Sequence, residues 1–283
     1  YGLNSNQVFV GVGSDDVLAI AFMTFFNSDK EILFPDITYS FYDVWADLYK
    51  IPYRMVELND EFRINIEDYL VPNGGIVIPN PNAPTGVEKD VRELEKIVAK
   101  NPDSVVIIDE AYVDFGATSM LPLINKYDNL LIVQTYSKSR SMAGARIGMA
   151  FGNEKLIKYM NDVKFSINSY TMNRLTVAAG TAALEDEEYF KETCDKVIAT
   201  RERTKVRLRE LGFDMPDSKS NFVFATHGSI PASDIFNAAK SAGIYLRWWN
   251  KDRISNRLRI SIGTDEEMDA LFAFLKEYIE ARG

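Results

Sequence analysis

Six short apolar runs separated by segments with helical spacing constrain the fold of this chain more than any other feature. The apolar runs are Gln7–Val10, Glu31–Phe34, Gly75–Ile78, Ser104–Ile108, Leu130–Gln134 and Ile147–Phe151. Runs of this length and composition are typical of buried strands in a parallel sheet. The segments between them include Asp15–Phe26, Phe41–Tyr49 and Glu88–Lys100. Strand and helix therefore alternate, which predicts an α/β domain with a mostly parallel sheet flanked by helices.

The pattern changes after residue 185. A long charged segment, Glu185–Leu211, has helical spacing. It is followed by predicted strands and helices in mixed order: Ser220–Thr226, Ala232–Ala242, Tyr245–Trp248, Arg257–Ile262 and Asp265–Ala281. This order favours a smaller α+β domain. We therefore predict a large domain over residues 1–185 and a small C-terminal domain over residues 186–283, joined by the long helix.

Composition excludes several classes of protein. The net charge is −9 and no long basic run occurs, so we expect no binding to nucleic acid or to a membrane surface. The longest apolar run, Val17–Phe26, is too short to span a bilayer. A single cysteine and a single histidine rule out an intrachain disulfide and a Cys/His zinc site, so we expect no metal and a cytoplasmic location. His227 is expected at the surface or in a loop.

Distinctive polar residues follow five of the predicted strands. They are Gly13-Ser14-Asp15, Thr38-Tyr39, Asn80 to Gly86, Asp109 to Tyr112, and Thr135 to Lys138. Ligands bind at the carboxyl ends of strands in open parallel sheets, so these residues are expected at one shared edge. Gly13-Ser14-Asp15 opens a helix after a strand, which suits a phosphate or a simple helix N-cap. It lacks the pattern of a Walker loop and of a dinucleotide fingerprint.

Asp109 and Lys138 are the two charged residues that stand out at these strand ends. A carboxylate at the end of an apolar strand is costly without a partner, so Asp109 has either a function or a strong structural partner. Partial burial of Lys138 would make its amine nucleophilic. A lysine after a strand is common, and Lys138 alone proves little.

Taken together, these residues resemble the fold-type I aminotransferases, most closely the histidinol-phosphate aminotransferase branch. The most specific element is Ser137-Lys138 followed by Ala143 to Gly148, which places Arg146 eight residues after the lysine. Three further motifs match in order: Gly13-Ser14-Asp15, Asn82 to Gly86, and Asp109 to Tyr112. The resemblance covers nearly the whole chain.

The resemblance implies a pyridoxal 5'-phosphate cofactor held by Lys138 as a Schiff base, with Lys138 moving the proton during catalysis. It implies that Asp109 pairs with the pyridine nitrogen, that Tyr112 bonds the ring hydroxyl, and that Tyr39 stacks on the ring. The phosphate would be bound by Gly13, Ser14, Asp15, Thr135, Ser137 and Arg146.

For the substrate, the resemblance points to Arg247, Arg259 and Asn221. Two arginines favour a phosphorylated substrate, and the implied reaction is transamination of L-histidinol phosphate with 2-oxoglutarate. The alternative for either arginine is a surface salt bridge, which is the role expected of Arg253 and Arg257. Trp248 and Trp249 could flank an imidazole or pack the small domain.

The chain departs from the family at two points. Ala83 stands where the family commonly has the asparagine that bonds the ring hydroxyl, and we expect Asn82 to replace it. The family also has an N-terminal arm before the position of Tyr1, which the sequence does not contain. That arm closes the active site and gives the partner subunit a tyrosine for the substrate phosphate. A protein that truly lacks the arm is expected to be poorly active, whereas the function stands if the arm is missing only from this sequence.

Several alternatives share these motifs. An aromatic or broad-range aminotransferase needs one arginine for a carboxylate, and a threonine-phosphate decarboxylase also binds a phosphorylated amine. The non-enzyme alternative is the ligand-binding domain of a transcription regulator, which would need a DNA-binding segment before Tyr1. A homodimer is expected from the resemblance.

Overall fold

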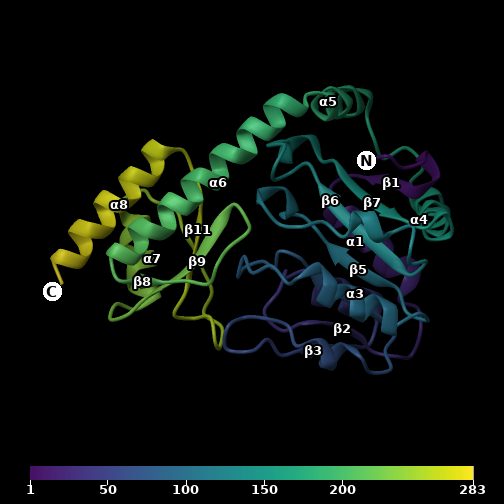
Figure 1. The fold of residues 1–283 in the computed structure, drawn as a ribbon, viewed down its shortest axis with the longest axis horizontal. Coiled ribbons are helices and arrows are strands. Elements are labelled where there is room, and N and C mark those ends of the chain that lie inside the picture. Colours follow the sequence, from purple (N-terminus) through teal and green to yellow (C-terminus); the bar gives the residue numbers. More distant parts are fainter. Residues whose placement is uncertain (283) are drawn as a thin grey trace.

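A computed structural model describes residues 1–282 and contains a seven-stranded and a four-stranded sheet (Figure 1). The larger sheet has the order β1-β7-β6-β5-β4-β2-β3. Its strands are β1 (Val8–Gly11), β2 (Ile32–Pro35), β3 (Tyr53–Val56), β4 (Gly75–Pro79), β5 (Val106–Asp109), β6 (Leu130–Thr135) and β7 (Gly148–Gly152). Strands β2 to β6 pair in parallel, which confirms the predicted α/β class with a mostly parallel sheet.

Strand β7 corrects one part of that prediction, because it runs antiparallel to both β1 and β6. A parallel return requires a crossover, usually through a helix. The connection from β6 to β7 holds only the short 3-10 helix Ala143–Ala145, so the chain turns back directly. Strand β1 pairs on the far side of β7 and therefore runs in the same direction as β6. The sequence analysis also missed edge strand β3, whose residues are mostly exposed or half-buried.

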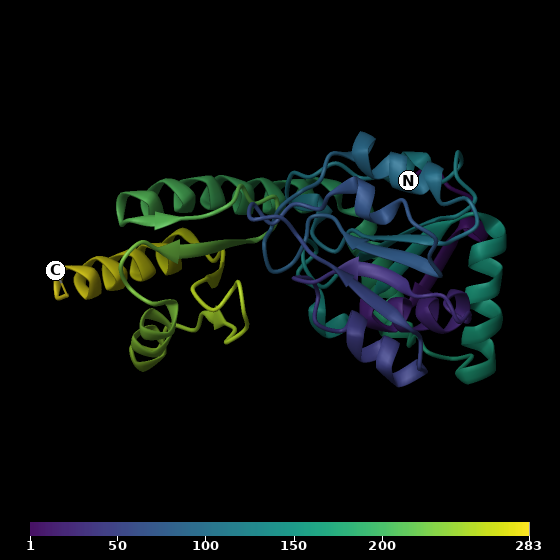
Figure 2. The same cartoon turned by 90° about the horizontal axis from the view of Figure 1, so that it is seen from below.

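Helices cover both faces of the larger sheet (Figure 2). Helices α1 (Ser14–Phe25), α2 (Tyr42–Tyr49) and α4 (Glu154–Ile167) pack on one face, and α3 (Val91–Lys100) packs on the other. The strand side chains alternate accordingly: Val77 and Ile107 face α1 and α2, whereas Ile76 and Ile108 face α3. Each such buried side chain contributes roughly 1.5–3 kcal/mol. Burial on both faces explains why the strands are apolar throughout.

The smaller sheet has the order β10-β11-β9-β8 and is antiparallel. Its strands are β8 (Phe213–Asp214), β9 (Phe222–His227), β10 (Arg247–Trp248) and β11 (Leu258–Ser261), and it packs against α6 (Glu187–Glu210), α7 (Ala232–Ser241) and α8 (Asp265–Glu280). His227 is buried at the end of β9, so its predicted exposure is wrong. Its ring lies edge-on to Phe213, and Nδ1 accepts from the amides of Ser229 and Ile230.

Helix α5 (Arg174–Glu185) precedes α6, which runs from the larger sheet to the smaller one (Figure 1). Arg201 on α6 is 1% exposed. Its guanidinium donates to the carbonyl of Phe115, which precedes the proposed domain boundary, and to that of Ser220, which follows it. We propose residues 185 and 186 as the domain boundary, because α6 begins directly afterwards. Single-turn 3-10 helices lie at Ser5–Gln7, Ile66–Tyr69, Val113–Phe115 and Leu121–Leu123.

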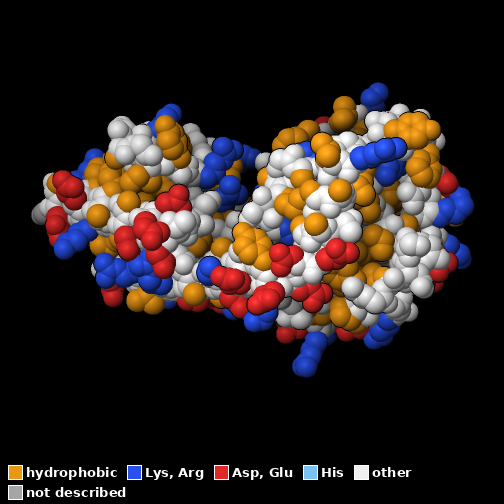
Figure 3. All heavy atoms as spheres, turned by 90° about the horizontal axis from the view of Figure 1, so that it is seen from above, with side chains coloured by type: hydrophobic (Ala, Val, Ile, Leu, Met, Phe, Trp, Pro, Cys, Tyr) orange, Lys and Arg blue, Asp and Glu red, His pale blue; other side chains and the backbone are white. Residues whose placement is uncertain are grey.

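Charged and hydrophobic side chains are interspersed on the face of the molecule seen in Figure 3. None of the helices within residues 1–282 combines the length and hydrophobicity that crossing a bilayer requires. The same residues contain no cluster of His, Cys, Asp and Glu side chains that could hold a metal ion.

Candidate active site

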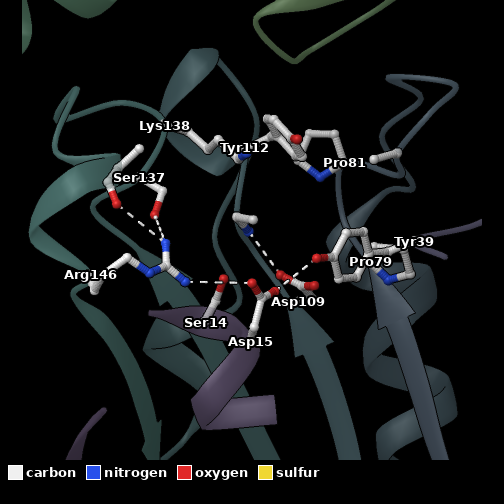
Figure 4. A pocket seen from close by; sticks show the side chains of 13 residues that line it. Ser14, Asp15, Tyr39, Pro79, Pro81, Asp109, Tyr112, Ser137, Lys138 and Arg146 are labelled. Carbon is white, nitrogen blue, oxygen red and sulfur yellow. Dashed lines mark hydrogen bonds and ion pairs between the residues drawn. The ribbon is translucent and has the colours of Figure 1, made fainter. Parts of the chain in front are cut away.

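A cavity lies at the carboxyl ends of the strands, and all five predicted strand ends contribute to its wall (Figure 4). β1, β2, β4, β5 and β6 share one direction, so their ends meet at this edge. The lining includes Ser14 and Asp15 after β1, Tyr39 after β2, Pro79 and Pro81 at β4, Asp109 and Tyr112 at β5, Ser137 and Lys138 after β6, and Arg146 before β7.

Asp109 is 5% exposed at the end of β5 and has two hydrogen-bond donors. The hydroxyl of Tyr42 donates to Oδ2 at 2.8 Å, and the amide of Ala111 donates to Oδ1 at 3.1 Å. Burial raises the pKa of Asp109 to about 6, although the two donors act in the opposite direction. Sequence analysis missed Tyr42, which lies on the apolar face of α2. The available signal is that a buried tyrosine hydroxyl usually requires a partner.

Arg146 and the start of α1 form the opposite end of the cavity. Gly13, at φ 93°, is the residue before α1, and no side chain among residues 1–282 caps the helix, so the amides of its first turn stay free. Nη1 of Arg146 lies 3.5 Å from Oγ of Ser137, and Nη2 lies 3.5 Å from Oδ2 of Asp15. The buried Thr135 accepts from the amide of Ser137 at 3.1 Å and holds that residue in place.

Lys138 and two tyrosines form the middle of the cavity. Nζ of Lys138 lies 5.5 Å from the ring centre of Tyr112. The hydroxyl of Tyr39 donates to Oδ1 of Asp15 at 2.8 Å. Lys138 is exposed, although it follows the buried strand β6.

Asn82 does not line this cavity, and its expected role as the replacement for the family asparagine stays a prediction. Its amide nitrogen donates to the carbonyl of Ile37 at 2.9 Å and to Oγ1 of Thr85 at 3.0 Å. The adjacent residue Ala83 lines the cavity instead. The two hydrogen bonds of the Asn82 amide nitrogen hold this loop in place.

A second cavity adjoins the first, and the two share Tyr39 and Ala83. Arg247, Trp249 and Arg259 line it from the smaller domain. Arg259 is half-buried, and its Nε is a buried donor without a partner among residues 1–282. Asn221 lines neither cavity; its carbonyl accepts from the amide of Ile262 at 2.9 Å.

The two arginines expected in surface salt bridges differ from each other. Arg253 does form an ion pair, at 2.6 Å from Asp36, and it also donates to the carbonyl of Leu58, so it connects the two sheets. Arg257 is half-buried and lies 4.8 Å from the ring centre of Phe62. No carboxylate pairs with Arg257 within residues 1–282, so that expectation is wrong. Stacking on a ring replaces the ion pair.

The residues present fit pyridoxal phosphate. A Cβ on Gly13 would lie 2.3 Å from Nη2 of Arg146, so only a glycine lets the guanidinium lie directly against this loop. Free amides at the start of α1 add donors of the right polarity. Asp109 offers a buried carboxylate to a protonated ring nitrogen, and Lys138 offers an amine between the two ends.

This combination of a mostly parallel sheet, a strand-end lysine and a buried strand-end aspartate defines a fold-type I aminotransferase. Residues 1–275 match the family described as aminotransferase class I and II, and the chain belongs to this family.

Within this family, the chain is similar to proteins named histidinol-phosphate aminotransferase. The chain is 51% identical over 278 residues to a histidinol-phosphate aminotransferase of Lactococcus lactis subsp. cremoris, covering 98% of this chain and 78% of the relative. It is 50% identical over 281 residues to one of Brachyspira hyodysenteriae, covering 99% and 79%. Its fold matches the crystal structure of histidinol-phosphate aminotransferase from Sinorhizobium meliloti in complex with pyridoxal-5'-phosphate, with a TM-score of 0.91, 24% identity, and coverage of 100% and 79%.

Proposed function

We propose that the chain is a pyridoxal-phosphate-dependent aminotransferase that acts on L-histidinol phosphate, with 2-oxoglutarate as the amino acceptor. The observation that carries this proposal is the pair Arg247 and Arg259, which lines a cavity adjoining that of Lys138. Two guanidinium groups suit a phosphate. The chain is 51% and 50% identical to two proteins named histidinol-phosphate aminotransferase, which supports the same substrate.

In this proposal, the two ends of the first cavity bind different parts of the cofactor. Ser14, Ser137 and Arg146 would bind the cofactor phosphate, with Gly13 allowing the Arg146 guanidinium to approach the loop and Thr135 holding Ser137. At the other end, Asp109 binds the ring nitrogen and keeps it protonated.

The remaining residues act between these ends. Tyr39 and Tyr112 hold the ring and its hydroxyl. When bound, pyridoxal phosphate supplies a conjugated ring that accepts the electron pair of the substrate carbon. Lys138 would hold the cofactor covalently through Nζ, and its amine would accept the proton from the substrate carbon.

The partner in our proposal is a second copy of the chain. Large hydrophobic side chains are exposed on and between α4 and α5, among them Phe165, Ile167, Tyr170, Leu175 and Val177. Tyr170 is 94% exposed and Leu175 is 83% exposed. An exposed apolar surface of this kind favours association, and a closed homodimer is the commonest assembly. We further propose a cytoplasmic location, which suits a chain with one cysteine.

The experiment that tests the function is the visible absorbance of the cofactor-loaded protein before and after addition of L-histidinol phosphate. We expect the band of the lysine-linked cofactor to disappear and then to return on addition of 2-oxoglutarate. A band that ignores this amine but responds to phenylalanine would reassign the protein as an aromatic aminotransferase. A response to threonine phosphate with release of carbon dioxide would make it a decarboxylase.

A further inference from the structure

Two arginines lie directly opposite each other on neighbouring strands of the smaller sheet. Arg247 on β10 pairs in antiparallel register with Arg259 on β11. Like charges at directly opposite positions of a sheet destabilise it. Within residues 1–282, no carboxylate forms an ion pair with either guanidinium. The two positive charges therefore require some other stabilisation.

The indole of Trp249 provides that stabilisation. The guanidinium carbon of Arg247 lies 5.2 Å from the Trp249 ring centre, and that of Arg259 lies 5.5 Å from it. Both distances are within the range of a cation–π contact. An aromatic face attracts a cation without occupying its N–H groups, whereas a carboxylate would accept from them. The donors of both arginines therefore stay available to an anion in the cavity.

Aromatic contacts also connect the arginine pair to the lysine. Arg259 lies 5.1 Å from the ring centre of Phe222, and Phe222 packs edge-on against Tyr112 at 5.1 Å. Nζ of Lys138 lies 5.5 Å from the centre of the same Tyr112 ring. These contacts fix the position of an anion bound by the two arginines relative to the amine of Lys138.

The electrostatics of the pair favour a doubly charged ligand. Burial lowers the pKa of Arg259, and the positive charge of Arg247 adds to this effect. A phosphate monoester carries about −1.5 to −2 charges near neutral pH, which matches both guanidinium groups. A single carboxylate leaves one positive charge of the pair unmatched.

We propose that Trp249 is a positioning residue that holds Arg247 and Arg259 together as one site, and so makes the cavity prefer a phosphate monoester to a single carboxylate. This inference rests on the proposed function, because it assigns the basis of specificity to the same cavity. Trp249 touches the two arginines, and its effect on the substrate is exerted through them.

Trp248 is the matched control. It is the neighbouring residue and also a half-buried tryptophan, but it packs against Phe236 at 5.8 Å. Its Nε1 donates to the carbonyl of Ser255 at 2.7 Å. Trp248 therefore takes the packing role that the sequence left open for both tryptophans, while Trp249 lines the cavity.

The test compares Trp249→Leu, Trp249→Phe and Trp248→Phe in the cofactor-loaded protein. Single-turnover reactions with L-histidinol phosphate and with L-phenylalanine, each without acceptor, give a half-saturating concentration and a limiting rate. For Trp249→Leu we expect the half-saturating concentration of the phosphorylated amine to rise about tenfold, since two cation–π contacts are lost. That of L-phenylalanine should rise about threefold or less, with the limiting rates nearly unchanged.

Trp249→Phe keeps a ring at this position and should fall between the wild type and Trp249→Leu, and Trp248→Phe should match the wild type. Calorimetric titration of the loaded proteins with inorganic phosphate gives a second readout, in which Trp249→Leu should bind about tenfold more weakly. Equal phosphate affinity in the wild type and both Trp249 variants would overturn this inference. A wild-type protein that binds phosphate but does not react with L-histidinol phosphate would instead overturn the proposed function.

Discussion

The hydroxyl of Tyr42 donates a hydrogen bond of 2.8 Å to Oδ2 of Asp109, across 67 positions of the sequence. Tyr42 is fully buried, and Asp109 is 5% exposed. Hydrogen bonds to a buried carboxylate favour its ionised form. Because Asp109 must be ionised to pair with a protonated ring nitrogen, Tyr42 supports the proposed role of Asp109 from outside the cavity.

Replacing Tyr42 with Phe should raise the pKa of Asp109, because the ionised carboxylate loses a donor. A hydrogen bond to a charged group contributes about 1.5 kcal/mol or more, which corresponds to about one pH unit. The acidic limb of the pH profile of kcat/KM should move upward by that amount. Tyr69→Phe is the matched control, because the Tyr69 hydroxyl is buried without a hydrogen-bond partner among residues 1–282. An acidic limb at the same pH in wild type and Tyr42→Phe would contradict the prediction.

Asp109 should make the stability of the cofactor-free protein depend on pH. Burial raises its pKa from 3.8 to about 6, so the folded state binds this proton more tightly than the unfolded state. The resulting stabilisation is complete below the unfolded pKa and is lost as the pH rises through about 6. The loss amounts to about 3 kcal/mol.

Asp109→Asn removes this titration and leaves that of Glu110, whose pKa burial raises to about 7. Urea unfolding from about pH 4 to about pH 8 should therefore show the variant gaining about 3 kcal/mol relative to the wild type. A difference between the two proteins that stays constant over this range would argue against a raised pKa.

Lys138→Ala should abolish the covalent attachment of pyridoxal phosphate, because Lys138 is the only lysine lining the first cavity among residues 1–282. The visible band of the bound cofactor should be absent, and reduction with borohydride should leave the protein mass unchanged. Lys126→Ala is the control, since Lys126 is exposed and pairs with Glu95. Retention of the cofactor mass by Lys138→Ala after reduction would refute the central assignment.

Gly13→Ala should weaken cofactor binding. The added Cβ would lie 2.3 Å from Nη2 of Arg146, and φ at this position is 93°, so both the guanidinium and the loop must shift. We expect the dissociation constant for pyridoxal phosphate to rise by about tenfold or more. Gly144→Ala is the control, because its Cβ would meet nothing within 4 Å. Equal affinity of the two alanine variants would exclude the proposed phosphate position.

Leu175→Asp should convert the proposed dimer to a monomer. Leu175 is 83% exposed, so the substitution leaves the fold of the single chain intact, whereas a charge buried in an interface is costly. Light scattering after gel filtration measures the change. Val206→Asp on α6, where Val206 is 54% exposed, should stay dimeric. A wild-type protein that is already monomeric would remove the basis for the prediction.

The direction of β7 shows where the sequence pattern was misleading, whereas the cofactor contact expected of Asn82 in place of Ala83 stays a prediction. The Asn82 amide nitrogen donates to the carbonyl of Ile37, and its Oδ1 is buried without a partner among residues 1–282. The apolar composition of residues 147–151 predicted a strand correctly and its direction wrongly. Composition reports burial and is the same for either direction, so only the length and path of the connection decide the pairing.

The sequence by itself determined the α/β class and the five strand ends that meet at the cavity. These features follow from local patterns, because apolar runs predict strands and the ends of parallel strands meet at one edge. Only the tertiary structure decided which buried groups become partners: Tyr42 with Asp109, Arg253 with Asp36, and Trp249 with both arginines. Such pairs join distant segments through packing and desolvation, and no local spacing encodes them.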